Sequence, residues 1–86
     1  MASKLFMAAF AAWQAERCER VAGAWSATGA LLADYQAWAH ANRAYLPTPR
    51  EFALALGQVE GLQKRLHSRS RRSGYVGLRV VDDAKG

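Results

Sequence analysis

The sequence predicts a mixed α+β fold in which three helices are followed by a β-hairpin. Apolar residues recur at helical spacing in three segments before Gly61. Beyond that point the helical pattern stops, and residues 75–81 are rich in side chains that favour strands. With 86 residues, of which 51% are hydrophobic, the chain can build one core. We therefore expect a single domain over residues 1–81 and a polar tail at 82–86.

The first helix is expected over residues 4–20, where alanine, the best helix former, is the commonest residue. Ser3 precedes this segment as a suitable N-cap. Gly23 ends the helix or lies just beyond its end, and Ala24-Trp25 is then a short extended segment. One face of the helix is predicted to pack in the core through three aromatic side chains, Phe6, Phe10 and Trp13.

The second helix is expected to run to about Asn42, with Ser26 or Thr28 as its N-cap. Leu46-Pro47 then marks a break, because proline disfavours helical backbone in the residue before it. Apolar positions with a period near 3.6 predict the buried stripe of this helix, which consists of Leu31, Leu32, Tyr35, Trp38 and Ala39.

The third helix has the clearest start signal in the chain. Thr48 is placed as the N-cap, Pro49 as the first helical residue and Glu51 as the third, which together form a capping box. Gly61 fits a left-handed stop beyond the helix. The short helix is predicted to bury one face, made of Phe52, Ala55, Leu56 and Val59.

The hairpin is predicted from the residues that follow. Residues 62–67 have no helical stripe, and the polar segment 68–74 ends in glycine, which is typical of a turn. In the strand 75–81, alternation places Val76, Leu78 and Val80 on one side and Tyr75, Arg79 and Val81 on the other. Tyr75 has two interpretations: it packs on the third helix, or it stacks on a nucleobase.

Positive charge is concentrated in the second half of the chain. Twelve Lys and Arg residues against seven Asp and Glu give a net charge of +5. Residues 1–35 sum to zero, whereas residues 36–81 carry eight basic and two acidic residues and sum to +6. Such an imbalance favours a polyanionic partner. The alternative is a solvated basic face that has no partner.

Two groups of residues are candidates for contacts with nucleic acid. Arg50, in the first turn of the third helix, is placed to contact a phosphate or a guanine edge, because helix N-termini attract anions. The Thr48 hydroxyl beside it has two interpretations: it donates to a phosphate as well as capping the helix, or it caps the helix alone. Arg43 in the preceding loop is a candidate phosphate contact. Gln58 is a second candidate for reading a base. The hairpin group contains no acidic residue and prefers arginine: Lys64, Arg65, Arg69, Arg71, Arg72 and Arg79.

The sequence lacks the signatures of an enzyme, a cofactor protein or a membrane protein. His40, His67 and Cys18 fall on different elements, so we expect no metal site and no catalysis. No glycine-rich phosphate loop precedes a helix, and we expect no cofactor and no small-molecule substrate. No run approaches about 18 apolar residues, so no membrane segment is expected. The single cysteine suits a reducing compartment and a cytoplasmic protein.

Three helices followed by a basic hairpin is the element order of a winged helix, whose second and third helices form a helix-turn-helix. Four parts of the sequence occur in the order and at the spacing of one known module. They are Phe10, Trp13 and Cys18, then Leu32-Ala-Asp-Tyr35-Gln-Ala-Trp38, then Thr48-Pro-Arg-Glu-Phe52-Ala-Leu-Ala-Leu56-Gly57, and last Tyr75-Val-Gly77-Leu78. In this the chain resembles the small winged-helix domain at the C-terminus of phage and plasmid primase-helicases of the D5-like type. The helicase ATPase that normally precedes that domain is not present in the sequence.

The resemblance implies DNA binding in the replication of a phage or plasmid, with a replication helicase or primase as a further partner. It does not imply priming or unwinding by this chain. From the residues we expect a DNA-binding protein of low sequence specificity, on duplex or single-stranded DNA. One alternative is an adaptor or inhibitor that docks on a nucleic-acid enzyme, which exposed Trp25, Tyr45 or Leu46 would favour. Another is a dimeric repressor.

Overall fold

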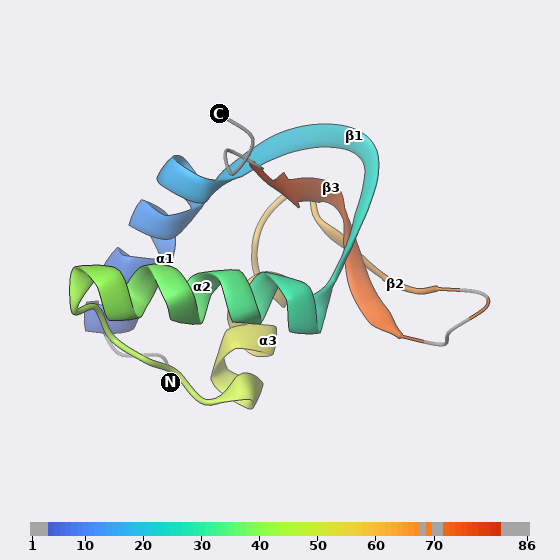
Figure 1. Ribbon diagram of the computed structural model, residues 1–86. Coiled ribbons are helices and arrows are strands. Elements are labelled where there is room, and N and C mark those ends of the chain that lie inside the picture. Colours follow the sequence, from blue (N-terminus) through green and yellow to red (C-terminus); the bar gives the residue numbers. More distant parts are fainter. Residues whose placement is uncertain (1–3, 68, 70–71, 82–86) are drawn as a thin grey trace.

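The computed structural model describes residues 4–67, 69 and 72–81. Three helices and three strands follow one another along the chain (Figure 1): α1 (Lys4–Arg17), β1 (Cys18–Ala27), α2 (Thr28–Asn42), α3 (Pro49–Gly57), β2 (Gln63–Leu66) and β3 (Ser73–Val80). The strands form one antiparallel sheet in the order β1-β3-β2. The helices group together, and the hairpin of β2 and β3 protrudes on the side away from the first turn of α1. The expected tail at 82–86 lies outside the described residues.

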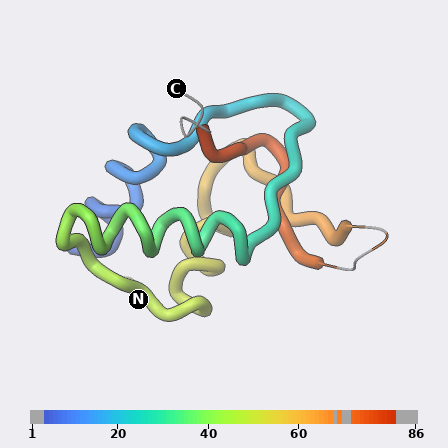
Figure 2. The backbone as a smooth tube through the Cα atoms, in the orientation of Figure 1, coloured from blue at the N-terminus to red at the C-terminus, as the bar shows by residue number. Residues whose placement is uncertain are grey.

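The mixed α+β class is confirmed, but the expected order of elements is wrong in one respect. A strand of ten residues, β1, lies between α1 and α2. The extended segment predicted at Ala24-Trp25 is confirmed, but the strand begins at Cys18, where we expected the first helix to continue to residue 20. Figure 2 shows this segment arching from the end of α1 to the start of α2. Its pairing with β3 starts at Cys18, opposite Val80. Pairing with a distant strand thus overrides the helix preference of a segment rich in alanine.

The predicted core faces of the three helices are confirmed. The aromatic side chains of α1 are buried and pack edge-on against those of the other helices, with Trp13 and Phe52 rings 5.5 Å apart. Leu32, Trp38 and Val59 are only partly buried and pack around the core. The fully buried set joins all three helices to β3: Phe6, Phe10, Trp13, Leu31, Tyr35, Ala39, Phe52, Ala55, Leu56, Tyr75 and Leu78.

The cap predicted for α3 is confirmed, whereas the cap predicted for α2 is wrong. The Glu51 backbone N–H donates to Thr48 Oγ1 at 3.1 Å, and the Thr48 N–H donates to Glu51 Oε1 at 2.8 Å. In α2 the N-cap is Ala27, which provides no side-chain cap. Ser26 is unavailable as a cap because its hydroxyl donates to the Leu78 carbonyl of β3 at 2.8 Å.

The predicted alternation of β3 is broken at Gly77. This glycine has φ of +110°, and a Cβ there would lie 3.0 Å from the Gly61 carbonyl oxygen. The register with β1 shifts at the same place, between Arg20 and Trp25. As a result Tyr75 and Leu78 are both buried, although strict alternation placed them on opposite sides. Gly61 is left-handed as expected, with φ of +87°, but α3 ends earlier, at Gly57.

Candidate nucleic-acid interface

Helix α3 presents a narrow exposed stripe on the side away from the core. Arg50 and Leu54 lie four residues apart on this stripe, and Gly57 and Gln58 continue it to the end of the helix. The buried face of α3 fixes the direction of the stripe, because the aromatic and aliphatic side chains of that face are held in the core. Arg50 and Gln58, both predicted to read bases, therefore point to solvent from the two ends of one helix.

A groove of about 410 Å³ lies between this stripe and strand β2. Tyr75 is 4% exposed, and its hydroxyl donates to the Ala53 carbonyl at 3.2 Å, so it packs on α3 as one of its two interpretations predicted. Burial raises the pKa of Tyr75 and keeps its ring uncharged. We call this hollow the α3–β2 groove and define it by its lining residues, Arg50, Ala53, Leu54, Gly57, Gln58, Lys64 and Tyr75.

Among the described residues, the α3–β2 groove is lined by two cations and no carboxylate. Lys64 is brought to it by the pairing of β2 with β3, which sets Lys64 directly opposite Tyr75. Within the part of the chain that the structure describes, the Arg50 and Lys64 side chains have no ion pair. The nearest acid along the chain, Glu51, is bound to Thr48 and to the Tyr45 hydroxyl. The groove therefore combines apolar walls with unneutralised positive charge.

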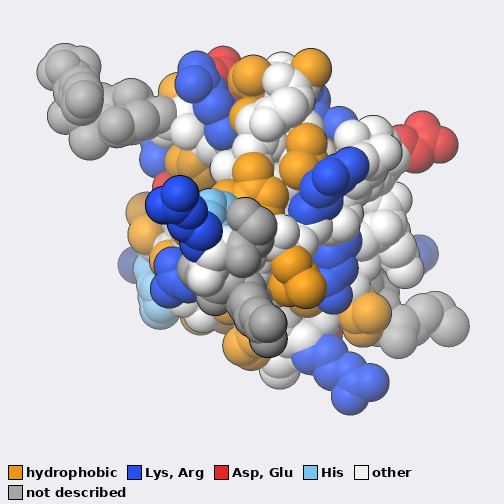
Figure 3. Space-filling view, turned by 90° about the vertical axis from the view of Figure 1, so that its right-hand side faces the viewer, with side chains coloured by type: hydrophobic (Ala, Val, Ile, Leu, Met, Phe, Trp, Pro, Cys, Tyr) orange, Lys and Arg blue, Asp and Glu red, His pale blue; other side chains and the backbone are white. Residues whose placement is uncertain are grey.

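The hairpin carries further basic residues beside the groove. Arg65 lies opposite Gly74 on β3, one residue on from Lys64, and so points to the other side of the strand. Arg65, Arg69 and Arg72 are exposed. Figure 3 looks at the side of the molecule from which the hairpin protrudes, and shows Lys and Arg side chains across that face with Asp and Glu at its margins. Arg71, also predicted to bind, lies outside the described residues.

Trp25 of β1 fixes the base of the hairpin. Its ring lies on Gly74 so closely that a Cβ there would come within 2.5 Å of the ring. Its Nε1 donates to the Arg65 carbonyl at 3.1 Å, and the ring packs 5.1 Å from that of His67. Trp25 thereby connects all three strands. An extended backbone was predicted at Ala24-Trp25, but the contacts of Trp25 could not be predicted, because they depend on the pairing of β1 with β3.

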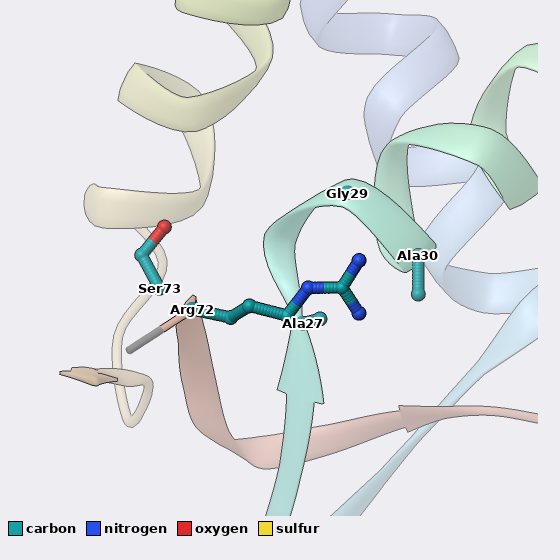
Figure 4. Close-up of a pocket in the computed structure, with 5 residues that line it drawn as sticks. All are labelled: Ala27, Gly29, Ala30, Arg72 and Ser73. Atoms are coloured by element: carbon teal, nitrogen blue, oxygen red, sulfur yellow. The ribbon is translucent and has the colours of Figure 1, made fainter. Parts of the chain in front are cut away.

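A second hollow of about 220 Å³ lies where α2 begins, and Figure 4 shows its five lining residues. The Arg72 side chain extends from the start of β3 toward the first turn of α2, near Gly29 and Ala30, while Ser73 points away from that turn. Arg72 is thus directed to the helix start and away from the α3–β2 groove. The other described residues that line the hollow are small: Ala27, Gly29 and Ala30.

Two predicted residues lie apart from the others. Arg79 forms an ion pair with Glu19 on the neighbouring strand β1. Arg43 is exposed and follows the last turn of α2 with a left-handed backbone, φ of 53°. Figure 1 places that end of α2 opposite the hairpin. The structure therefore brings Arg50 of α3 together with Lys64 of the hairpin at one groove, keeps the Thr48 hydroxyl in the cap of α3, and leaves Arg43 and Arg79 outside this group.

Among the described residues, no three His, Cys, Asp or Glu side chains lie close enough to hold a metal ion. Burial, and secondarily the charge of Asp34, raises the pKa of Cys18 to about 12, so this thiol is not an activated nucleophile. No described helix has the length and apolar character needed to cross a membrane.

Comparison with known proteins does not assign the chain to a family. No protein-family model matches it, and no curated protein is significantly similar to it in sequence. The function is therefore inferred from the residues and the geometry described above.

Proposed function

We propose that this protein is a DNA-binding domain of the winged-helix type with low sequence specificity. Helix α3 enters the major groove, and the hairpin of β2 and β3 acts as the wing that follows the phosphate backbone. The extra strand β1 joins the sheet of the hairpin and leaves α2 and α3 consecutive, as a helix-turn-helix requires.

The observation that carries the proposal is the basic surface made by α3 and the hairpin. Residues 61–81 contain no Asp or Glu. Arg50 and Lys64 face one groove, while Arg65, on the other side of β2, and Arg69, in the turn after it, add exposed positive charge along the hairpin. Cations without carboxylate partners repel one another, and a polyanion relieves that repulsion. Few side chains besides Arg50 and Gln58 are placed to read base edges, which accounts for low specificity.

Salt dependence tests this proposal. Neutralising about five phosphates gives a slope of roughly −4 to −5 when the logarithm of the binding constant for duplex DNA is plotted against the logarithm of salt concentration. The measurement is fluorescence anisotropy of a labelled duplex between about 50 and 200 mM salt. Changing Arg69, Arg71 and Arg72 together to Ala should weaken binding to unrelated sequences equally and make the slope shallower by about 2 to 3.

The control for these changes is Lys4→Ala, which removes one positive charge from α1, on an element outside the proposed interface. It should leave affinity almost unchanged, whereas the single change Arg69→Ala weakens binding measurably. A binding constant that does not respond to salt would rule out the electrostatic mechanism.

The resemblance to D5-like primase-helicases leads us to propose that this binding serves the replication of a phage or plasmid. In that setting a replication helicase or primase is the natural protein partner. Co-purification of such an enzyme with the tagged protein, retained after nuclease treatment, would support the partnership.

The adaptor alternative has less support. An adaptor would need Trp25, Tyr45 or Leu46 to be exposed. Trp25 is half-buried and donates to the Arg65 carbonyl, and Tyr45 is half-buried and donates to the Glu51 carboxylate. Only Leu46 of these three is exposed, at 48%. Failure to bind any DNA at low salt would make the adaptor the better account.

A further inference from the structure

We infer that the α3–β2 groove takes an unpaired nucleotide, so that the protein prefers a duplex with a single-stranded end to a blunt duplex. The inference rests on the proposed DNA binding and adds to it the class of DNA end that is recognised. It is carried by the chemistry of the groove, in which apolar surface and unpaired cations lie together.

The apolar part of the groove is open to a ligand. Leu54 is 60% exposed on the outer stripe of α3, and Ala53 and Tyr75 line the same hollow. At about 410 Å³ the hollow is of the size that accepts small organic groups. A phosphate backbone alone does not account for this surface, because its contacts are made by charged and polar side chains.

The charged part of the groove suits the other half of a nucleotide. Arg50 on α3 and Lys64 on β2 lie on the two sides of the hollow, and neither has an ion pair among the described residues. A nucleotide combines an apolar base face with an anionic phosphate. Within a duplex the base faces are stacked on one another and only the edges are accessible, so that a paired base is open on its face only at the very end. An unpaired nucleotide presents its base face together with its own phosphate and is free to enter a groove.

A second exposed leucine adjoins the groove. Leu66 is 68% exposed and lies two residues beyond Lys64 on β2, so the two side chains point to the same side of the strand. Proteins that open or bend DNA place apolar side chains against base steps beside basic residues. Leu66, with Arg65 and Arg69 nearby in sequence, is placed to cover the last base pair while the unpaired nucleotide enters the groove.

An acidic peptide with an apolar side chain also matches cations beside apolar walls. Continuity favours the nucleic acid, because the groove opens on strand β2 of a hairpin that carries further exposed arginines, Arg65 on the other side of the strand and Arg69 in the turn after it. A DNA strand leaving the groove meets this hairpin with its next phosphates. A short peptide uses the groove and leaves the hairpin without a ligand.

The experiment compares fluorescence anisotropy titrations of three duplexes of one sequence at a fixed low salt concentration. One is blunt, and the others carry a short 3′ or 5′ overhang. A longer blunt duplex with as many phosphates as the overhang duplexes controls for charge. We expect one of the overhang duplexes to bind about fivefold more tightly than the charge-matched blunt duplex. Equal affinities would overturn the inference.

Variants at Gly57 locate the effect in the groove. Gly57 is exposed, and a Cβ there meets only the Tyr75 hydroxyl at 3.8 Å, so a larger side chain fills the groove without a clash in the core. Gly57→Leu should abolish the preference for the overhang, measured as the ratio of overhang to charge-matched blunt affinity within the same variant, so that any effect of the new side chain on duplex binding cancels. Gly57→Ala, with the same gain in helix propensity, should keep the preference. Circular dichroism confirms folding of both variants.

Leu66→Ala is the second test and should lower the overhang preference without altering the groove. Persistence of the preference in Gly57→Leu would place the unpaired strand elsewhere and overturn the inference. A third outcome would also overturn the inference: overhangs are not preferred, while an acidic leucine-containing peptide binds to the unaltered protein and not to Gly57→Leu. If the unaltered protein binds no DNA at all, the proposed function is refuted instead. Failure of the inference and failure of the proposed function are therefore distinguishable.

Discussion

The single thiol of the chain, Cys18, lies where α1 ends and β1 begins. Burial, followed by the charge of Asp34, raises its pKa from 9.0 to about 12. Well below pH 9 the folded protein therefore holds far less thiolate than the unfolded chain. We expect alkylation by iodoacetamide near about pH 8 to be slow in the native protein and fast in denaturant. Mass spectrometry of the two reactions measures the difference.

The same shift has a consequence for stability. Because the pKa is higher in the folded state, the contribution of Cys18 is complete below pH 9.0 and is lost as the pH rises toward about 12. Cys18→Ala should remove part of this alkaline loss. Tyr35, Tyr45 and Tyr75, whose pKa values are also raised, remain to produce the rest. Equal alkylation rates in native protein and denaturant would contradict the burial of the thiol.

At the scale of elements, α3 depends on its capping box. Thr48→Ala removes the acceptor for the Glu51 backbone N–H and should lower the free energy of unfolding by about 1 kcal/mol. Because α3 lines the proposed interface, the same change should also weaken DNA binding. Urea denaturation measures the first effect and anisotropy the second.

The carboxylate of the box adds a dependence on pH. The N–H of Thr48, and then the Tyr45 hydroxyl, lower the pKa of Glu51 below 4.5. Its contribution to stability is therefore present above about pH 4.5 and is lost as the pH falls through the lowered value. Glu51→Gln is the control, and its unfolding should depend less on pH in this range. An identical acid profile in both proteins would show that the box does not hold the carboxylate.

The strand β1 shows why an element can escape sequence reasoning. Local signals were sufficient for α3, whose cap, proline and apolar face lie within a few residues of one another. β1 has alanine and charged residues that suit a helix, and its support comes from β3, as in the bond from Ser26 to Leu78 across 52 residues. A bulge then lets this strand follow β3 past Gly77. Neither the partner nor the bulge is visible in the local sequence.

At the scale of the whole molecule, the candidate site was predictable in composition and not in geometry. The excess of arginine after Gly61 predicted a basic hairpin, and α3 was predicted to present Arg50. Lys64 and Arg50 face each other across one groove for two reasons. The pairing of β2 with β3 sets Lys64 opposite Tyr75, and Tyr75 in turn packs against Ala53 of α3. The exposure of Leu54 and Leu66 follows from the same packing, so only the folded chain reveals an apolar groove between cations.

The charge of the molecule should make its stability and its binding respond to salt in opposite directions. With a net charge of +5 and basic residues concentrated on one side, the free protein repels itself, and salt screens that repulsion. Raising the salt concentration should therefore raise the Tm of the free protein by about 4 °C, equivalent to about 1 kcal/mol, while it weakens DNA binding. The control replaces Lys64, Arg65 and Arg69 with Gln, which should raise the Tm at low salt and flatten both responses. Differential scanning calorimetry with and without DNA measures the two responses to salt. If the Tm of the free protein falls as salt is added, these cations are neutralised within the fold and leave no free charge for a nucleic acid.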